Sequence, residues 1–341
     1  MSQKNETLLL LLSSIIPIGL ILAGLWFFRD IWQPKPNSNQ PNNIAQNQSN
    51  GKCEVPNLPQ GTFNYGDSTT WAPIRKDVDS ELQKRCPGFI LRYVQPPSGK
   101  PGSGTGIRML IDNQLAFSQS SRSVQPQENS AAQQKGFTLK EIPVAIDGIA
   151  IAVNPNLNIP GLTVSQLKDI YTGKITNWRE VGGTNLPITP FSRNQEAGGT
   201  VEFFVQNVLE GERFANNVSY IGTTTEALRK LAANPGGIYY ASAPEVVPQC
   251  TIKSLAIGRT SQQLITPYQE PYISPSQCPN QRNQLNAQMF RSGEYPITRN
   301  LFVIIKQNGQ VDQQAGEAYA NWLLSSPGQE LLEKAGFIRI K

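Results

Sequence analysis

One stretch of this sequence combines an arginine, two glycines and a helix start: Ser192-Arg193-Asn194-Gln195-Glu196-Ala197-Gly198-Gly199-Thr200, running into Val201–Leu209. Apolar residues after Thr200 recur at the i, i+3, i+4, i+7 and i+8 positions of a helix with one buried face. Gly198 and Gly199 let the backbone approach a ligand closely, and Thr200 supplies a hydroxyl at the helix start. The free N–H groups of the first helical turn and the guanidinium of Arg193 suit a tetrahedral oxyanion. The stretch therefore predicts an anion site, with an ordinary capped helix beside a surface arginine as the alternative.

The composition suits a folded protein and excludes several kinds of chemistry. The chain has 341 residues, of which 38% are hydrophobic and 16% charged, a size at which one core usually splits into two lobes. The formal net charge is +5, but the basic residues are scattered, so we expect no nucleic-acid partner. There is no histidine, which excludes Ser-His-Asp catalysis and His-containing zinc sites. Phosphate-loop, nucleophile-elbow and dinucleotide-binding motifs are also absent. We expect no enzyme activity, no metal and no cofactor.

The N-terminus predicts a membrane anchor followed by a tether. Leu8 to Phe28 contains no charged residue and is long enough to cross a hydrocarbon core of about 30 Å as a helix. A cleavable signal peptide is the alternative, although no A-x-A pattern follows the aromatic end of this run. The next segment is rich in Asn, Gln, Pro and Ser and cannot bury enough apolar surface to order itself. We therefore predict an anchor over residues 1–30, a tether over 31–52 and a folded domain over 53–341.

Four cysteines indicate the compartment of the folded part. None of them lies in a C-x-x-C pair, and in a chain with a targeting segment an even number predicts two disulfides in an oxidising environment. Three connectivities are possible, and we favour Cys53–Cys86 with Cys250–Cys278 because each pair closes a local loop. Four free, buried thiols are the alternative. The folded part is therefore expected outside the cytoplasmic membrane.

Strands and helices alternate through the folded part, which predicts an α/β protein. Two more strand–turn–helix junctions carry glycines and hydroxyls, at Gly66-Asp67-Ser68-Thr69-Thr70-Trp71-Ala72-Pro73 and at Gly102-Ser103-Gly104-Thr105-Gly106. A further predicted strand ends in Ser120-Ser121-Arg122. With Arg193 and the Gly198–Thr200 turn, these donors fit an oxyanion held in a cleft between two lobes.

The apolar, β-branched run from Glu141 to Val153 predicts a buried strand that crosses between the lobes. Asp147 lies inside this run, and a buried carboxylate needs partners or a proton. Ile252 to Ile257 also has the pattern of a strand.

Taken together, these motifs resemble the periplasmic phosphate-binding proteins of phosphate ABC transporters, and the cysteine-bearing, anchored form resembles cyanobacterial members. The resemblance covers about residues 53 to 341. It is carried by Gly66–Pro73, Gly102–Gly106, Ala145–Ala150, Leu167–Trp178, Ser192–Thr200 and Ser326–Phe337. It implies a type 2 periplasmic-binding fold with a ligand cleft between two lobes, lobe 1 over about 53–146 and 265–341 and lobe 2 over about 147–264. It also implies a monomer that binds inorganic phosphate without catalysis, on the periplasmic side of the cytoplasmic membrane, and delivers it to permease subunits.

The resemblance also implies which residues bind the ligand. By motif position these are Thr70, Trp71, Ser103, Arg193, Gly198, Gly199 and Thr200. From the residues themselves we add Thr69, Ser121, Arg122 and Asp147 to the expected phosphate-binding set. Two positions depart from the family pattern. Gly198 stands where a serine hydroxyl is usual, and Ser121 stands where some members carry the aspartate that accepts the proton of hydrogen phosphate. Asp147, or with less support Asp67, is our hypothesis for a replacement acceptor.

The acceptor decides which oxyanion the site prefers. Phosphate near neutral pH carries a proton that needs an acceptor, whereas sulfate carries none and is repelled by a carboxylate. Three alternatives to a phosphate receptor therefore stay open: a receptor for sulfate or another tetrahedral oxyanion, a module that senses phosphate, and a phosphoryl-transfer enzyme that works without histidine.

Overall fold

The computed structural model describes residues 53, 55–98, 101–194 and 198–340. The predicted anchor (1–30) and tether (31–52) lie outside the described residues. Within the described part of the chain, no helix is both long enough and apolar enough to cross a membrane.

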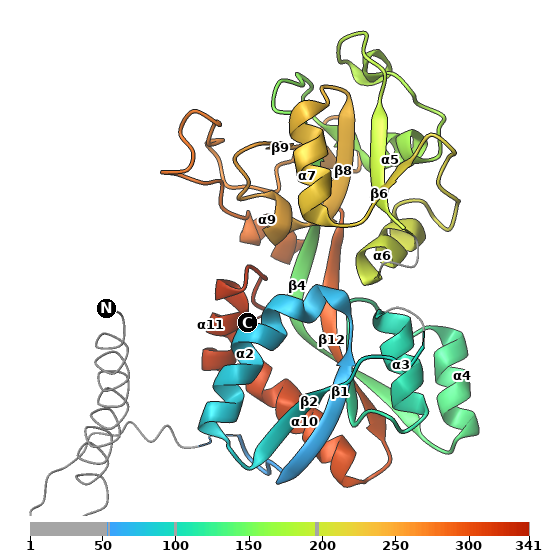
Figure 1. Ribbon diagram of the computed structural model, residues 1–341, viewed down its shortest axis with the longest axis vertical. Coiled ribbons are helices and arrows are strands. Elements are labelled where there is room, and N and C mark those ends of the chain that lie inside the picture. Colours follow the sequence, from blue (N-terminus) through green and yellow to red (C-terminus); the bar gives the residue numbers. More distant parts are fainter. Residues whose placement is uncertain (1–52, 54, 99–100, 195–197, 341) are drawn as a thin grey trace, which may run out of the picture. The chain divides into compact units, whose positions relative to one another are not determined.

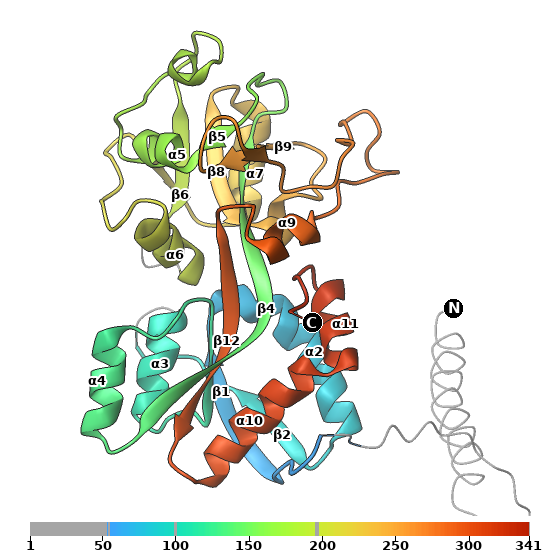
Figure 2. The ribbon, with the colours of Figure 1, turned by 180° about the vertical axis from the view of Figure 1, so that it is seen from behind.

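Two lobes are joined by two long antiparallel strands, β4 (Thr138–Val153) and β12 (Thr298–Gln307), which lie side by side in Figures 1 and 2. Residues Thr138–Gly148 of β4 pair with β12, and its last five residues pair with β8 (Gly237–Ser242) of the second lobe. The paired strands follow the order β2-β1-β3-β12-β4-β8-β6-β7. The crossing strand predicted at 141–153 is confirmed, and β12 is a second crossing strand that the sequence did not reveal.

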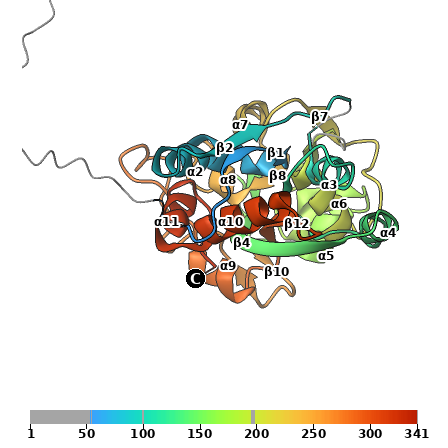
Figure 3. The same ribbon diagram turned by 90° about the horizontal axis from the view of Figure 1, so that it is seen from below.

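The first lobe surrounds the parallel strands β1 and β2. Ile74, Val78 and Leu82 bury one side of α2 in the core of this lobe, together with Trp71 of η1, and Pro73 occupies the first turn of α2. Figure 3 shows α10 beside β12. The elements of this lobe are β1 (Gly61–Asp67), the 3₁₀ helix η1 (Thr69–Trp71), α2 (Ala72–Arg85), β2 (Phe89–Tyr93), α3 (Ser103–Ile111), β3 (Phe117–Ser120), α4 (Pro126–Gln134), α10 (Val311–Leu324) and α11 (Ser326–Lys334).

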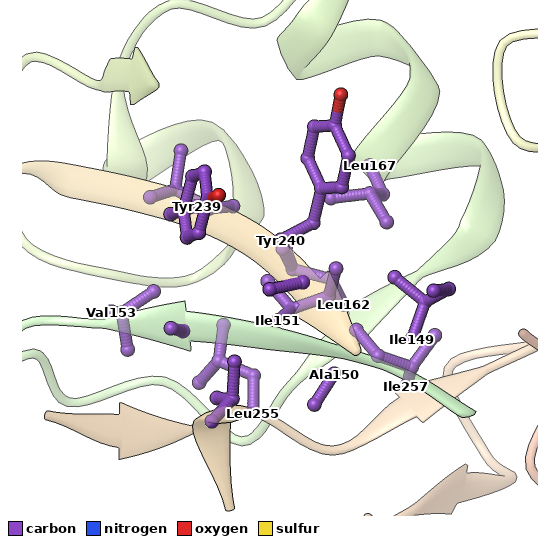
Figure 4. Close-up of a cluster of buried hydrophobic side chains, with 14 of the residues drawn as sticks. Ile149, Ala150, Ile151, Val153, Leu162, Leu167, Tyr239, Tyr240, Leu255 and Ile257 are labelled. Atoms are coloured by element: carbon purple, nitrogen blue, oxygen red, sulfur yellow. The ribbon is translucent and has the colours of Figure 1, made fainter. Parts of the chain in front are cut away.

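The second lobe packs around the last residues of β4, where Ile149, Ile151 and Val153 contact a fully buried apolar cluster (Figure 4). The sequence placed the return to lobe 1 at residue 265, whereas Tyr295 and Ile297 still belong to this second core. The elements are β5 (Leu162–Thr163), α5 (Val164–Tyr171), η2 (Trp178–Val181), β6 (Thr189–Arg193), α6 (Gly199–Asn207), β7 (Ser219–Ile221), α7 (Thr224–Ala233), β8, α8 (Ala243–Val246), β9 (Lys253–Ser254), β10 (Ile257–Gly258), β11 (Leu264–Ile265) and α9 (Ala287–Ser292).

The predicted strand at Ile252–Ile257 is wrong in its continuity. The chain forms two short strands instead, because β9 pairs with β4 of the large sheet while β10 pairs with β5 and β11 in a separate sheet. The backbone N–H of Leu255, between them, donates to the Ile151 carbonyl before the chain changes sheets.

Both predicted disulfides are confirmed. Cys53 bonds to Cys86 and Cys250 bonds to Cys278, with Cα–Cα distances of 5.0 and 5.7 Å. The first bond ties the start of the described chain to the end of α2, and the second closes a local loop in the second lobe.

A buried carboxyl in the first lobe predicts a pH-dependent stability. Asp79 of α2 accepts hydrogen bonds from the hydroxyls of Tyr65 (2.5 Å) and Tyr319 (2.8 Å), yet burial dominates and raises the pKa of Asp79 to about 7. Because this pKa is higher in the folded than in the unfolded chain, the group favours folding fully below about pH 4. That contribution, on the order of 4 kcal/mol, is lost as the pH rises from about 4 to about 7.

We expect Asp79→Asn to remove this dependence. Between pH 4 and 7 the free energy of unfolding of the unaltered protein should fall relative to that of the variant, as measured by urea unfolding at each pH. Parallel pH profiles for the two proteins would show that Asp79 does not titrate in this range.

Candidate functional site

The start of α6 lies against the first lobe, where the expected ligand residues converge. A Cβ atom on Gly199 would lie 2.3 Å from the Ser121 hydroxyl oxygen, and one on Gly198 would lie 2.5 Å from the Thr69 hydroxyl oxygen. Gly198 also has a φ of +120°, a conformation that side-chain-bearing residues rarely adopt. Only glycines therefore allow this approach, which brings the first turn of α6 to the junction between the lobes.

Three serine hydroxyls meet opposite α6, and all three side chains are fully buried. The Ser68 hydroxyl donates to the Ser121 hydroxyl at 3.1 Å, and the Ser103 and Ser121 hydroxyls are 3.2 Å apart. The backbone N–H of Ser121 also donates to the Ser103 hydroxyl at 3.0 Å. Ser103 and Ser121 were predicted, whereas Ser68 was missed although it precedes Thr69 in the same hydroxyl-rich turn.

The turn after β1 is held in place by Asp67 and Trp71. The carboxylate of Asp67 accepts from the Tyr93 hydroxyl at 2.8 Å and from the Gly102 N–H at 3.3 Å, which fixes the start of α3. Burial raises the pKa of Asp67. The indole of Trp71 donates to the Ser120 carbonyl, and its backbone N–H, which the resemblance implied as a ligand donor, donates to the Ser68 carbonyl.

The guanidinium of Arg122 forms ion pairs with two carboxylates. It donates to Glu128 of α4 at 2.8 and 2.9 Å, to the Ser123 carbonyl at 2.8 Å and to Glu202 of α6 at 2.6 Å. Only 7% of the Arg122 surface is exposed to solvent. Since Glu202 belongs to the second lobe, Arg122 forms an ion pair across the junction instead of pointing a free guanidinium at a ligand.

Arg193 differs from Arg122 in its contacts. It ends β6, and its buried Nε has no hydrogen-bond partner within the described residues. A buried, charged donor without an acceptor is costly, so this atom indicates a place for an anion.

Asp147 is a partner of an arginine that the sequence reasoning missed. Arg299 of β12 lies opposite Asp147 of β4 in the ladder of the crossing strands, and its guanidinium donates to Asp147 Oδ2 at 2.8 and 3.0 Å. The Ser242 hydroxyl donates to Asp147 Oδ1 at 2.6 Å. Asp147 and Arg299 are both buried, so the described contacts of Asp147 compensate a charge within the protein. A lone arginine in the apolar run after Pro296 was the available signal.

Arg299 also reaches the predicted ligand turns. It donates to the Thr70 hydroxyl at 3.1 Å, to the Thr200 hydroxyl at 2.9 Å and to the Gly199 carbonyl at 3.0 Å. Within the described part of the chain, no three acidic or cysteine side chains gather into a group that could hold a metal ion. The junction is therefore rich in hydrogen-bond donors, and the carboxylates that its residues contact are already engaged.

Comparison with known proteins identifies the family. A family model described as a PBP superfamily domain matches residues 58–327. The chain is 25% identical over 280 residues to the phosphate-binding protein PstS of Staphylococcus haemolyticus, covering 80% of this chain and 78% of that one. It is 23% identical over 280 residues to the protein SphX of Synechococcus elongatus, covering 80% and 75%. A substrate-binding protein of a phosphate ABC transporter from Clostridium perfringens, solved with bound phosphate, has the same fold, with a TM-score of 0.63 at 23% identity over 82% of this chain and 100% of that one. Because the family model spans most of its length, this chain belongs to the PBP superfamily.

Proposed function

We propose that this protein captures inorganic phosphate outside the cytoplasmic membrane for an ABC-type importer. The observation that carries the proposal is the junction itself: turns from distant parts of the chain place hydroxyl and N–H donors together, beside a buried Arg193 Nε without an acceptor among the described residues. Such a donor set suits a dehydrated tetrahedral oxyanion. The phosphate-binding relatives, PstS of S. haemolyticus among them, support phosphate as that anion.

The proposed ligand set is narrower than the sequence suggested. We assign the charge to Arg193 and the surrounding donors to Thr69, Thr70, Ser103, Ser121 and the Gly198–Thr200 turn. Arg122 and Asp147 support the site through their ion pairs with Glu202 and Arg299. Catalysis is not part of the proposal, because the described residues at the junction supply neither an activated nucleophile nor a metal cluster.

The proposal also covers the membrane anchor and the cellular location of the protein. Residues 1–30 would anchor a monomer in the cytoplasmic membrane, residues 31–52 would tether it, and the two-lobed domain would work on the periplasmic side. There it would deliver phosphate to the permease subunits. Lobe limits of about 53–146 with 298–341 and 147–297 fit the two cores, since Tyr295 and Ile297 pack with the second core. Ile338, which pairs with Ile146, also contacts that core.

Calorimetry of the detergent-solubilised full chain with phosphate, sulfate and a phosphomonoester tests the function. We expect saturable binding of one phosphate, weaker binding of sulfate and no hydrolysis of the ester. Turnover of the ester, or no binding of any tetrahedral oxyanion, would contradict the proposed receptor function.

A second candidate is a receptor that accepts sulfate as well. Ser121 stands where some members of the family carry a carboxylate, and Asp67 and Asp147 already accept hydrogen bonds from other donors. A hydroxyl can both donate and accept, so Ser121 tolerates a ligand with or without a proton. Sulfate binding as tight as phosphate binding would favour this candidate.

Ser121→Asp should sharpen the preference for phosphate. The new carboxylate can accept the proton of hydrogen phosphate but repels sulfate, so we expect the phosphate-to-sulfate affinity ratio to rise on the order of tenfold or more. Competition calorimetry measures the ratio, with Ser121→Asn as a control of the same shape without charge. An equal rise in both variants would show that the carboxylate charge is not the cause.

A further inference from the structure

We propose that Arg299 is a positioning residue that fixes the hydroxyls of Thr70 and Thr200 as donors to the bound oxyanion. The inference rests on the proposed function and deepens it. It assigns a role to a residue outside the ligand turns, on the crossing strand β12.

The charge of Arg299 is already balanced without a ligand. Its side chain is 1% exposed, Asp147 is fully buried opposite it, and two hydrogen bonds join the pair. The guanidinium carbon also lies 5.5 Å from the centre of the Phe203 ring. A dianionic ligand therefore gains little electrostatic stabilisation from Arg299. The Nε of Arg193, which has no partner among the described residues, is the better source of positive charge.

Arg299 also binds both sides of the junction. Its Nη2 shares two hydrogens among Asp147 Oδ2 and the hydroxyls of Thr70 and Thr200, so one of these hydrogen bonds is bifurcated, while Nη1 donates to the Gly199 carbonyl. Thr70 lies in η1 of the first lobe, whereas Gly199 and Thr200 open α6 of the second lobe. One guanidinium reaches the Thr70 hydroxyl, the Thr200 hydroxyl and the Gly199 carbonyl, at 3.1, 2.9 and 3.0 Å. The planar fork of arginine makes these bonds in fixed relative directions, which a lysine ammonium cannot reproduce.

Accepting a hydrogen bond from Arg299 restricts the direction in which each threonine hydroxyl can donate. A threonine hydroxyl has one hydrogen and two lone pairs, so a hydroxyl that accepts from a guanidinium must point its own hydrogen elsewhere. Thr70 and Thr200 are both partly exposed at the junction, where the oxyanion is proposed to sit. Arg299 thus holds two donors in the orientation that the ligand requires before it binds, which lowers the ordering cost of binding.

A double-mutant cycle on the full chain tests the role. Arg299→Lys keeps the charge beside Asp147 but loses the fork, and Thr70→Val with Thr200→Val removes the two hydroxyls while keeping their shape. Phosphate affinity is measured by calorimetry for the unaltered chain, for each change alone and for the combination. We expect Arg299→Lys to weaken phosphate binding roughly 10- to 100-fold in the unaltered chain and less than about threefold in the valine background.

The outcomes separate this inference from the proposed function. Equal losses in both backgrounds, or unchanged affinity in Arg299→Lys, would overturn the positioning role while leaving the receptor intact. Absence of phosphate binding by the unaltered chain would overturn both. If Arg299→Lys does not fold, the paired change Arg299→Gln with Asp147→Asn removes both charges together and enters the same cycle with the same expectation.

Discussion

Gly199→Ala should weaken phosphate binding by on the order of 100-fold or more while leaving each lobe as stable as before. The added methyl would lie 2.3 Å from the Ser121 hydroxyl and 3.1 Å from the Ser103 hydroxyl, both on the opposite lobe. These side chains are short and fully buried, so neither can move aside. The lobes would have to separate, which removes the N–H groups of α6 from the ligand. Alanine suits a first helical turn, so the free energy of unfolding should change by less than about 1 kcal/mol.

A matched glycine and a compensating change control this prediction. Gly222→Ala, also in the second lobe, places its methyl 3.5 Å from the Glu226 carboxylate, an ordinary contact, and should bind phosphate as the unaltered chain does. Adding Ser121→Gly to Gly199→Ala removes the nearest obstacle and should recover part of the affinity. Calorimetry gives the affinities, and urea unfolding gives the stabilities. Unchanged phosphate affinity in Gly199→Ala would mean that the ligand does not bind between lobes closed in this way.

Local chemistry made much of the fold predictable. The run at 141–153 is apolar and β-branched, and those properties alone make a buried strand of β4. The break within Ile252–Ile257 could not be predicted in this way. The local sequence does not indicate that β9 pairs with β4 while β10 pairs with β5 of a separate sheet. The role of β12 likewise depends on its pairing with β4, which lies far away in the sequence.

The candidate site also contains residues that local sequence predicts and residues whose contacts depend on distant parts of the chain. Glycines and hydroxyls at strand–helix turns have a local sequence pattern, and the structure brings the predicted Gly198–Thr200 turn and Ser103 together at the junction. Charged side chains take their roles from tertiary partners instead. Arg122 and Asp147 were expected at the ligand, but Glu202 and Arg299 come from distant elements and engage them.

Arg193→Gln should produce the largest loss that a single side chain at this site can cause. Its Nε is buried without a partner among the described residues, so a bound dianion would pair with it in a largely desolvated place. Removing one member of such a pair costs about 2–5 kcal/mol, or roughly 30- to 5,000-fold in affinity. Calorimetric titration with phosphate measures the loss, and Arg179→Gln, an exposed arginine in η2 of the same lobe, controls for the change in net charge.

Arg193→Lys separates charge from geometry. Lysine keeps the positive charge but presents a point charge instead of a planar fork, so we expect it to recover only part of the affinity lost in Arg193→Gln. Full recovery would mean that charge alone holds the anion and that the fork is dispensable. If Arg193→Gln binds phosphate no more weakly than Arg179→Gln does, Arg193 does not contact the ligand, and the hydroxyl and N–H donors would have to hold a dianion without a cation beside it. Such donors orient an oxyanion well but leave its charge uncompensated in a buried place, which is why the arginine is expected to dominate the affinity.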